Sequence, residues 1–154
     1  MKSSKAGFYW YFRSRADFER QLFGHWRELE TRRVIAEAQS EADPARKVER
    51  LFHAVVQLRG SGDFLFFLRR LALRRPQLAR LVQATEAERL SFVTGTLQEL
   101  GVAEPVLTAE SLYHLYLGWY ERNRFKAPSA AEISRQLRVV SRMIGAQLGD
   151  RRSS

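Results

Sequence analysis

The chain contains no cysteine among its 154 residues, and this absence excludes several kinds of protein at once. Disulfide scaffolds, zinc–thiolate sites and enzymes with a thiol nucleophile all need cysteine. Long apolar runs are also missing. No stretch approaches the roughly 18 residues that a membrane-spanning helix requires, and the aromatic run at 8–12 is too short for a secretory signal peptide. We therefore expect a cytoplasmic protein without a membrane partner.

Recognisable catalytic and metal-binding patterns are absent as well. The sequence has neither a glycine-rich phosphate-binding loop nor the motif that presents a serine nucleophile. Three histidines occur, and none has a metal-binding partner four residues later: His25, His53 and His114. We expect neither an enzyme nor a bound metal or cofactor.

The composition is that of a globular domain with an excess of positive charge. Apolar residues make up 45% and charged residues 28% of the chain, which is ordinary for one soluble domain. With 26 lysines and arginines against 17 aspartates and glutamates, the formal net charge is +9. This excess favours anionic partners such as nucleic acid. One basic cluster near aromatic residues contains no acidic residue, and its members are Lys2, Lys5, Arg13 and Arg15.

Capping residues divide the chain into helices. Ser14 and Asp17 form a capping box, as do Ser129 and Glu132, while Asp43 precedes a proline at a first helical position. Between these signals apolar residues recur at helical spacing, with no alternating β pattern. A buried strand is the competing interpretation of the apolar segment 64–68. We predict an all-α fold with six helices near 15–39, 43–59, 63–73, 76–100, 108–124 and 129–149.

The first eighteen residues differ from the rest because they interleave aromatic and basic side chains. Ser4, Lys5, Phe8, Tyr9 and Phe12 match a Ser-Lys-Gly-x-(Leu/Phe)-Tyr-x-His-Phe pattern, although alanine and tyrosine replace its glycine and histidine. This stretch resembles the recognition helix of the TetR family of transcriptional repressors, and a capped helix follows at the family's spacing. Two alternatives do not involve DNA. One is a purely structural aromatic cluster, and the other is a membrane-interface peptide with basic and aromatic anchors.

The resemblance implies how the chain is divided. Residues 1–14 would be the remnant of a helix-turn-helix DNA-binding head, 15–149 a helical regulatory core, and 150–154 a polar tail. The family's first two helices would lie upstream of the recognition helix. We therefore expect one of two situations. Either Met1 is an internal start within a longer reading frame, or the chain is a core without a DNA-binding head.

The resemblance also implies which residues would contact a double-stranded DNA operator. Lys5 and Arg15 would contact phosphates, and Tyr9 would lie against the sugar-phosphate backbone. Small and aromatic side chains on a helix in the major groove contact base edges and thymine methyl groups. The residues that would face the groove are Ser4, Ala6, Gly7 and Trp10.

A ligand pocket inside the core is a further implication of the resemblance. Its aromatic-rich lining would suit an apolar or aromatic effector, with polar contacts from one or two of His53, Thr85, Arg89 and Tyr113. The alternative is that these aromatic residues belong only to the core. The residues expected at the pocket are Phe52, Val56, Phe64, Phe67, Leu71, Thr85, Arg89, Phe92, Tyr113, Tyr116 and Trp119.

The last two helices, within 108–149, are expected to form a four-helix homodimer interface with a second copy. The first of them carries two apolar faces, and the second carries one clean apolar stripe. One of these faces needs a partner outside its own core. Burial within one chain is the alternative. The expected interface residues are Leu117, Tyr120, Ile133, Leu137, Val140, Ile144 and Leu148.

These expectations together describe a ligand-responsive repressor of the TetR type. It would bind DNA as a homodimer and be released by a small apolar or aromatic effector. The alternative function is a dimeric ligand-binding or interaction module that does not bind DNA by itself.

The homodimer is directly testable by light scattering. Because an apolar helix face is left for a second copy, the purified chain at micromolar concentration should show twice the 17.9 kDa mass of one chain. A mass of one chain under these conditions would contradict the prediction.

Overall fold

The computed structural model describes residues 11–57, 62–123, 125–126 and 128–149, and every regular element within them is helical. The prediction of an all-α fold is confirmed. None of the described helices combines the length and the apolar character that crossing a bilayer would need. The elements are α2 (Arg15–Arg27), η1 (Glu28–Arg32), α3 (Arg33–Gln39), α4 (Pro44–Gln57), α5 (Gly62–Ala72), α6 (Pro76–Glu99), α7 (Pro105–Arg122) and α8 (Ala130–Gly149).

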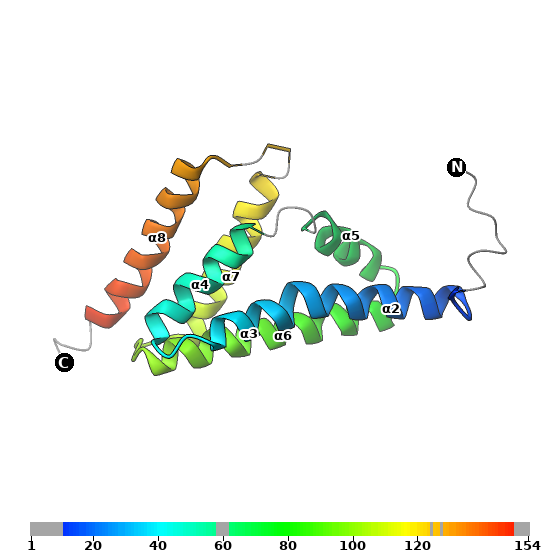
Figure 1. Cartoon of the computed structure of the whole chain (residues 1–154), viewed down its shortest axis with the longest axis horizontal. Coiled ribbons are helices and arrows are strands. Elements are labelled where there is room, and N and C mark those ends of the chain that lie inside the picture. The colour runs from blue at the N-terminus through cyan, green and yellow to red at the C-terminus, as the bar shows by residue number, and fades with distance from the viewer. Residues whose placement is uncertain (1–10, 58–61, 124, 127, 150–154) are drawn as a thin grey trace.

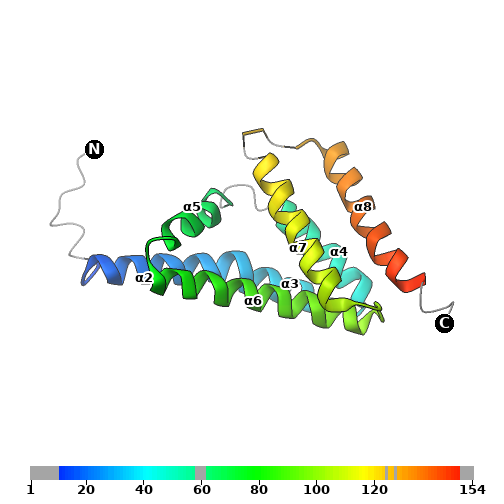
Figure 2. The same ribbon diagram turned by 180° about the vertical axis from the view of Figure 1, so that it is seen from behind.

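Two long helices form the base of the structure. Because α2, η1 and α3 follow one another without a break, they form one long helix, and α6 lies alongside it (Figures 1 and 2). The helices α4 and α7 pack at the α3 end, with α8 beyond them, whereas α5 packs over the α2 end. With α2, η1 and α3 counted as one, the described residues contain the six predicted helices.

The predicted capping residues begin three of these helices. The hydroxyl of Ser14 accepts the N–H of Asp17 at 3.1 Å, and that of Ser129 accepts the N–H of Glu132 at 3.3 Å. The Asp43 carboxylate accepts the N–H of Ala45 at 3.1 Å. These side chains satisfy backbone donors that have no partner within the helix. The three helix starts were therefore predictable from local sequence.

The start of α7 differs from the prediction, which placed it at Thr108. The helix begins three residues earlier at Pro105, and Thr108 is buried within it. Proline is favoured at the first helical position because it has no N–H to leave unpaired. The proline, and not the threonine, marks this boundary.

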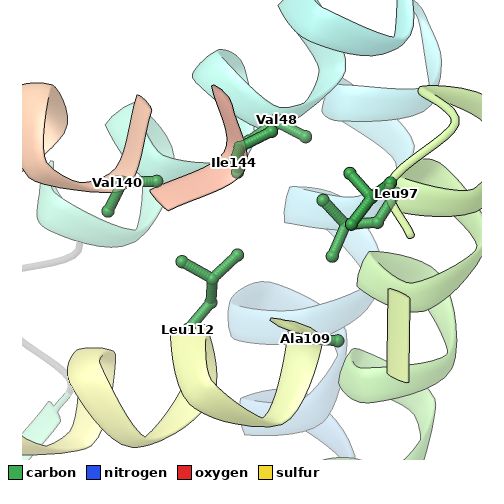
Figure 3. Close-up of a cluster of buried hydrophobic side chains, with 7 residues drawn as sticks. Val48, Leu97, Ala109, Leu112, Val140 and Ile144 are labelled. Carbon is green, nitrogen blue, oxygen red and sulfur yellow. The ribbon is translucent and has the colours of Figure 1, made fainter. Parts of the chain in front are cut away.

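Two apolar clusters hold the helices together. The first joins α4, α6, α7 and α8, and Figure 3 shows its labelled side chains converging from these helices: Val48, Leu97, Ala109, Leu112, Val140 and Ile144. The second joins α2, α5 and α6 through Trp26, Leu65, Leu68, Leu78 and Val82. Helix α6 therefore contributes buried residues to both clusters.

Several residues expected at a homodimer interface lie inside the chain's own core. Val140 is 3% exposed and Ile144 is 8% exposed, because the apolar stripe of α8 packs on α4 and α7. Leu117 packs against the second cluster. Ile133 and Leu137 are half-buried, and Leu148 is exposed. The surface of Val140 and Ile144 is therefore covered by this chain itself, and the homodimer interface stays a prediction.

A glycine ends α6 and turns the chain into α7. Gly101 has φ 78°, its N–H donates to the Gln98 carbonyl at 2.9 Å, and the Val102 N–H donates to the Leu97 carbonyl at 3.0 Å. This is the Schellman pattern of a helix end, and the accompanying apolar contact lies between Leu97 and Val102. Both side chains are fully buried, so the turn and the first cluster form together.

Two glycine substitutions near the end of α6 should change stability in opposite directions. Gly101→Ala should lower the free energy of unfolding by about 1–2 kcal/mol, because alanine is strained at a left-handed position. Gly95→Ala should raise it by about 1 kcal/mol, because alanine favours a helix interior and its Cβ meets no atom within 4 Å. Urea unfolding measures both. Equal effects of the two substitutions would contradict this account of the turn.

Candidate functional site

A cavity of about 80 Å³ lies where η1 and α3 face α4, α6 and α7, and we call it the central cavity. Its lining is mostly aliphatic and aromatic, with a few polar groups from η1, α6 and α7. Apolar walls with a small number of polar groups are typical of small-molecule sites. The lining residues are Glu30, Thr31, Val34, Ile35, Leu51, Phe52, Val55, Arg89, Phe92, Val93, Ala109, Leu112, Tyr113, Tyr116 and Tyr120.

The structure brings together five of the residues expected at the pocket. Phe52 comes from α4, Arg89 and Phe92 from α6, and Tyr113 and Tyr116 from α7. Their spacing within α6 and α7 places them on the faces that meet the long helix. These five expected residues therefore lie together around one cavity, and their role in ligand binding stays a prediction.

Other residues expected at the pocket do not line this cavity. Phe64 and Leu71 on α5 pack against the second cluster, and Phe67 is 56% exposed. Helix α5 packs at the α2 end of the long helix, away from α4 (Figure 1). Thr85 is buried, but its hydroxyl donates to the Leu81 carbonyl at 2.8 Å. Trp119 is half-buried outside the lining.

Three further residues with an expected role are Val56, His53 and Tyr120. The side chain of Val56 lies outside the described residues. His53, a candidate polar contact, is exposed and borders a separate polar hollow with Glu49 and Arg50. Tyr120, expected at the dimer interface, lines the central cavity instead and stacks on Phe66 with ring centroids 5.4 Å apart. Its ring therefore packs within this chain, and its role at a dimer interface stays a prediction.

Arg89 is the main polar group of the central cavity. Its Nε donates to the Thr31 hydroxyl at 2.9 Å, and an Nη2 hydrogen is directed at the Glu30 carbonyl at 3.4 Å. The guanidinium carbon lies 5.3 Å from the centre of the Trp26 ring, within the range of a cation–π interaction. Arg89 thereby connects α6 to the middle of the long helix.

A π-helical turn provides the acceptors for Arg89. Within η1 the Arg33 N–H bonds to the carbonyl of Glu28, five residues earlier, instead of four as in an α-helix. Thr31 is 1% exposed and Glu30 is 9% exposed, so this turn buries polar residues against α6. Single π-helical turns inside α-helices occur often at functional sites. In this chain the π-helical turn forms part of the wall of the central cavity.

Two tyrosines of the cavity, Tyr113 and Tyr116, stay protonated over an extended pH range. Burial raises the pKa of Tyr113 to about 12, and the positive charge of Arg89 partly opposes this rise. Burial likewise raises the pKa of Tyr116, again against the charge of Arg89. The Tyr113 hydroxyl donates to a Glu86 carboxylate oxygen at 3.3 Å. Both phenols are therefore neutral hydrogen-bonding groups at physiological pH.

Sequence reasoning missed the wall that the long helix contributes. The apolar pattern weakens after Leu29, and the buried positions that follow are the polar Glu30 and Thr31. A π-turn also shifts the spacing of buried residues, so a search at helical spacing does not find them. The interruption of the stripe was the only available signal.

Of the residues expected to contact DNA, the described part of the chain includes Arg15 alone. Its side chain is 78% exposed and pairs with Glu19 at 3.1 Å. The charge is therefore reachable from solvent at the start of α2. The others lie outside the described residues: Ser4, Lys5, Ala6, Gly7, Tyr9 and Trp10.

Comparisons of the chain with protein-family models, with curated proteins and with solved structures found no match. Within the described residues, no group of three or more histidines, aspartates and glutamates is arranged to hold a metal ion. The functional interpretation therefore depends on the cavity and on the residues of the sequence themselves.

The raised pKa of Tyr113 predicts a change in stability at alkaline pH. The folded chain keeps this proton up to about pH 12, while an unfolded chain loses it near 10. The stabilising contribution is therefore present below pH 10 and is lost as the pH rises toward 12. Ultraviolet titration should show tyrosines that ionise later in the folded chain than in urea, and Tyr113→Phe should remove one. Identical titrations of folded and unfolded chains would rule this out.

Proposed function

We propose that this protein is a ligand-responsive transcriptional repressor of the TetR type, with its effector site in the central cavity. One observation carries the proposal: the long helix that begins at Arg15, directly after the aromatic-basic stretch of residues 1–14, also forms one wall of the cavity. A ligand in the cavity would contact the same helix that leads to the expected DNA-binding residues.

The cavity is small for an effector in its present form. Sites for drug-sized ligands usually measure about 300–1,000 Å³, whereas the central cavity measures about 80 Å³. Binding would therefore displace side chains that border the cavity. Arg89 is the side chain whose displacement would matter most, because its contacts with Thr31 and Glu30 hold η1 against α6.

Displacement at η1 would be transmitted to α2. Upstream of the cavity, Arg27 donates to Glu88 at 2.8 Å, and Arg75 donates to Glu19 at 2.6 Å, so two ion pairs connect α2 to α6. A ligand that binds one arrangement of the long helix more tightly than another shifts the population toward it. In a homodimer this would change the spacing of two recognition helices, which must match half-sites about one DNA turn apart.

A module that binds ligand without binding DNA is the second candidate. All described lining residues fall between positions 30 and 120, so the cavity does not require the aromatic-basic stretch. Such a module would act through a partner protein or as a dimer alone. Tight, sequence-specific DNA binding by the 154-residue chain would exclude it.

The proposal is tested with DNA that flanks the protein's own gene. The chain, with any in-frame coding sequence upstream of the Met1 codon included, should bind this DNA with an affinity that falls steeply as salt increases. Fluorescence anisotropy measures the affinity. Arg15→Gln should weaken binding on all sequences alike and lower the salt slope by about 1.

The matched control is Arg138→Gln, which removes the same charge from an exposed position on α8. It should leave the salt slope unchanged. Salt-insensitive binding, or no binding at all by the ligand-free protein, would contradict the repressor.

A further inference from the structure

We propose that the ligand of the central cavity is a small carboxylic acid with an apolar body, held through its carboxylate by Arg89. This rests on the proposed ligand-binding function and specifies its chemical class. The inference depends on the charge, the neighbours and the burial of one side chain.

Arg89 carries a positive charge, and its hydrogen-bond acceptors are neutral groups. Among the described residues, no carboxylate lies close enough to Arg89 to form an ion pair, although Arg27, Arg69 and Arg75 each pair with a glutamate. Its acceptors are the hydroxyl of Thr31 and the carbonyl of Glu30. A guanidinium at an apolar cavity gains more from a carboxylate than from neutral acceptors, because the carboxylate carries the opposite charge and can accept two parallel hydrogen bonds.

The phenols beside Arg89 fit the same ligand. Because burial raises the pKa of Tyr113 to about 12 and also raises that of Tyr116, both remain neutral hydroxyl groups. They add no negative charge that would repel a carboxylate. Both phenols line the same cavity as the guanidinium of Arg89.

Glu30 is the feature that would favour the opposite class of ligand. Its side chain also borders the cavity, and its negative charge helps to raise the pKa of Tyr116. A cationic amine would be attracted to it. Glu30 already takes part in another interaction, whereas Arg89 has no ion-pair partner among the described residues. This difference favours an acid.

The size and walls of the cavity limit the body of the acid. An apolar cavity of about 150 Å³ admits benzene, and the central cavity measures about 80 Å³. A single ring or a short chain is therefore the largest body that fits with modest side-chain movement. Phe52, Val55 and Phe92 would surround it.

Three probes with the same ring and different head groups test the inference: benzoate, benzyl alcohol and benzylamine. Isothermal titration calorimetry of the full chain near neutral pH should show benzoate binding about tenfold or more tightly than benzyl alcohol, with benzylamine weakest. Arg89→Gln should abolish the preference for benzoate. Arg80→Gln removes the same charge from an exposed position on the same helix and should preserve it.

The outcomes separate this inference from the proposed function. Equal binding of benzoate and benzyl alcohol would overturn the acid class while leaving a ligand-binding cavity in place. Tighter binding of benzylamine would overturn it in favour of an amine held by Glu30. Binding of none of the three would also overturn it, and the DNA experiment would then decide the repressor separately. Should Arg89→Gln fail to fold, the comparison of the three probes on the unmodified chain decides the outcome.

Discussion

The contact of Arg89 with the π-helical turn is the interaction on which the centre of this structure depends. The turn buries Thr31 and Glu30 where an ordinary helix would present apolar residues, and buried polar groups are costly unless they are hydrogen-bonded. Arg89 donates to the Thr31 hydroxyl and to the main-chain carbonyl of Glu30, and it places its charge over Trp26. The indole N–H of Trp26 has no acceptor among the described residues, a cost of about 1–3 kcal/mol that the ring's packing and its contact with Arg89 must offset.

This polar centre separates two apolar clusters that share α6. Leu97 on α6 belongs to the cluster with α4, α7 and α8, whereas Leu78 and Val82 belong to the cluster with α2 and α5. Close-packed clusters resist deformation, because each side chain fills the space between its neighbours. The stretch between them, where Arg89 faces η1, contains the central cavity. Movement of the long helix relative to α6 therefore meets least packing resistance at the cavity.

The sequence predicted the features that depend on bonds between nearby residues of the chain. It missed the features that depend on packing between helices. Ser14, Asp43 and Ser129 begin helices through bonds to residues two or three positions away, so their roles were visible without a fold. The stripe of α8 was visible too, but the partner that covers Val140 is set by tertiary packing. Phe67 is aromatic, like many of the residues expected at the pocket, but its side chain is exposed to solvent. The π-turn could not be predicted, because its buried residues are polar and its spacing is not that of an α-helix.

The interactions that hold the long helix against α6 have free energies small enough for a bound ligand to offset them. The ion pairs between α2 and α6 are partly exposed, with side chains of Arg27 and Glu88 at 31% and 29%, and such pairs contribute about 0–1 kcal/mol each. The hydrogen bond from the charged Arg89 to Thr31 contributes somewhat more, about 1.5–3 kcal/mol. A coupling free energy of about 1–3 kcal/mol between two sites is typical of allosteric proteins. A ligand that takes over the guanidinium from η1 would therefore supply a free energy comparable to what holds this turn in place. Because Trp26 of α2 belongs to the second cluster, a movement at η1 would carry part of this cluster with it.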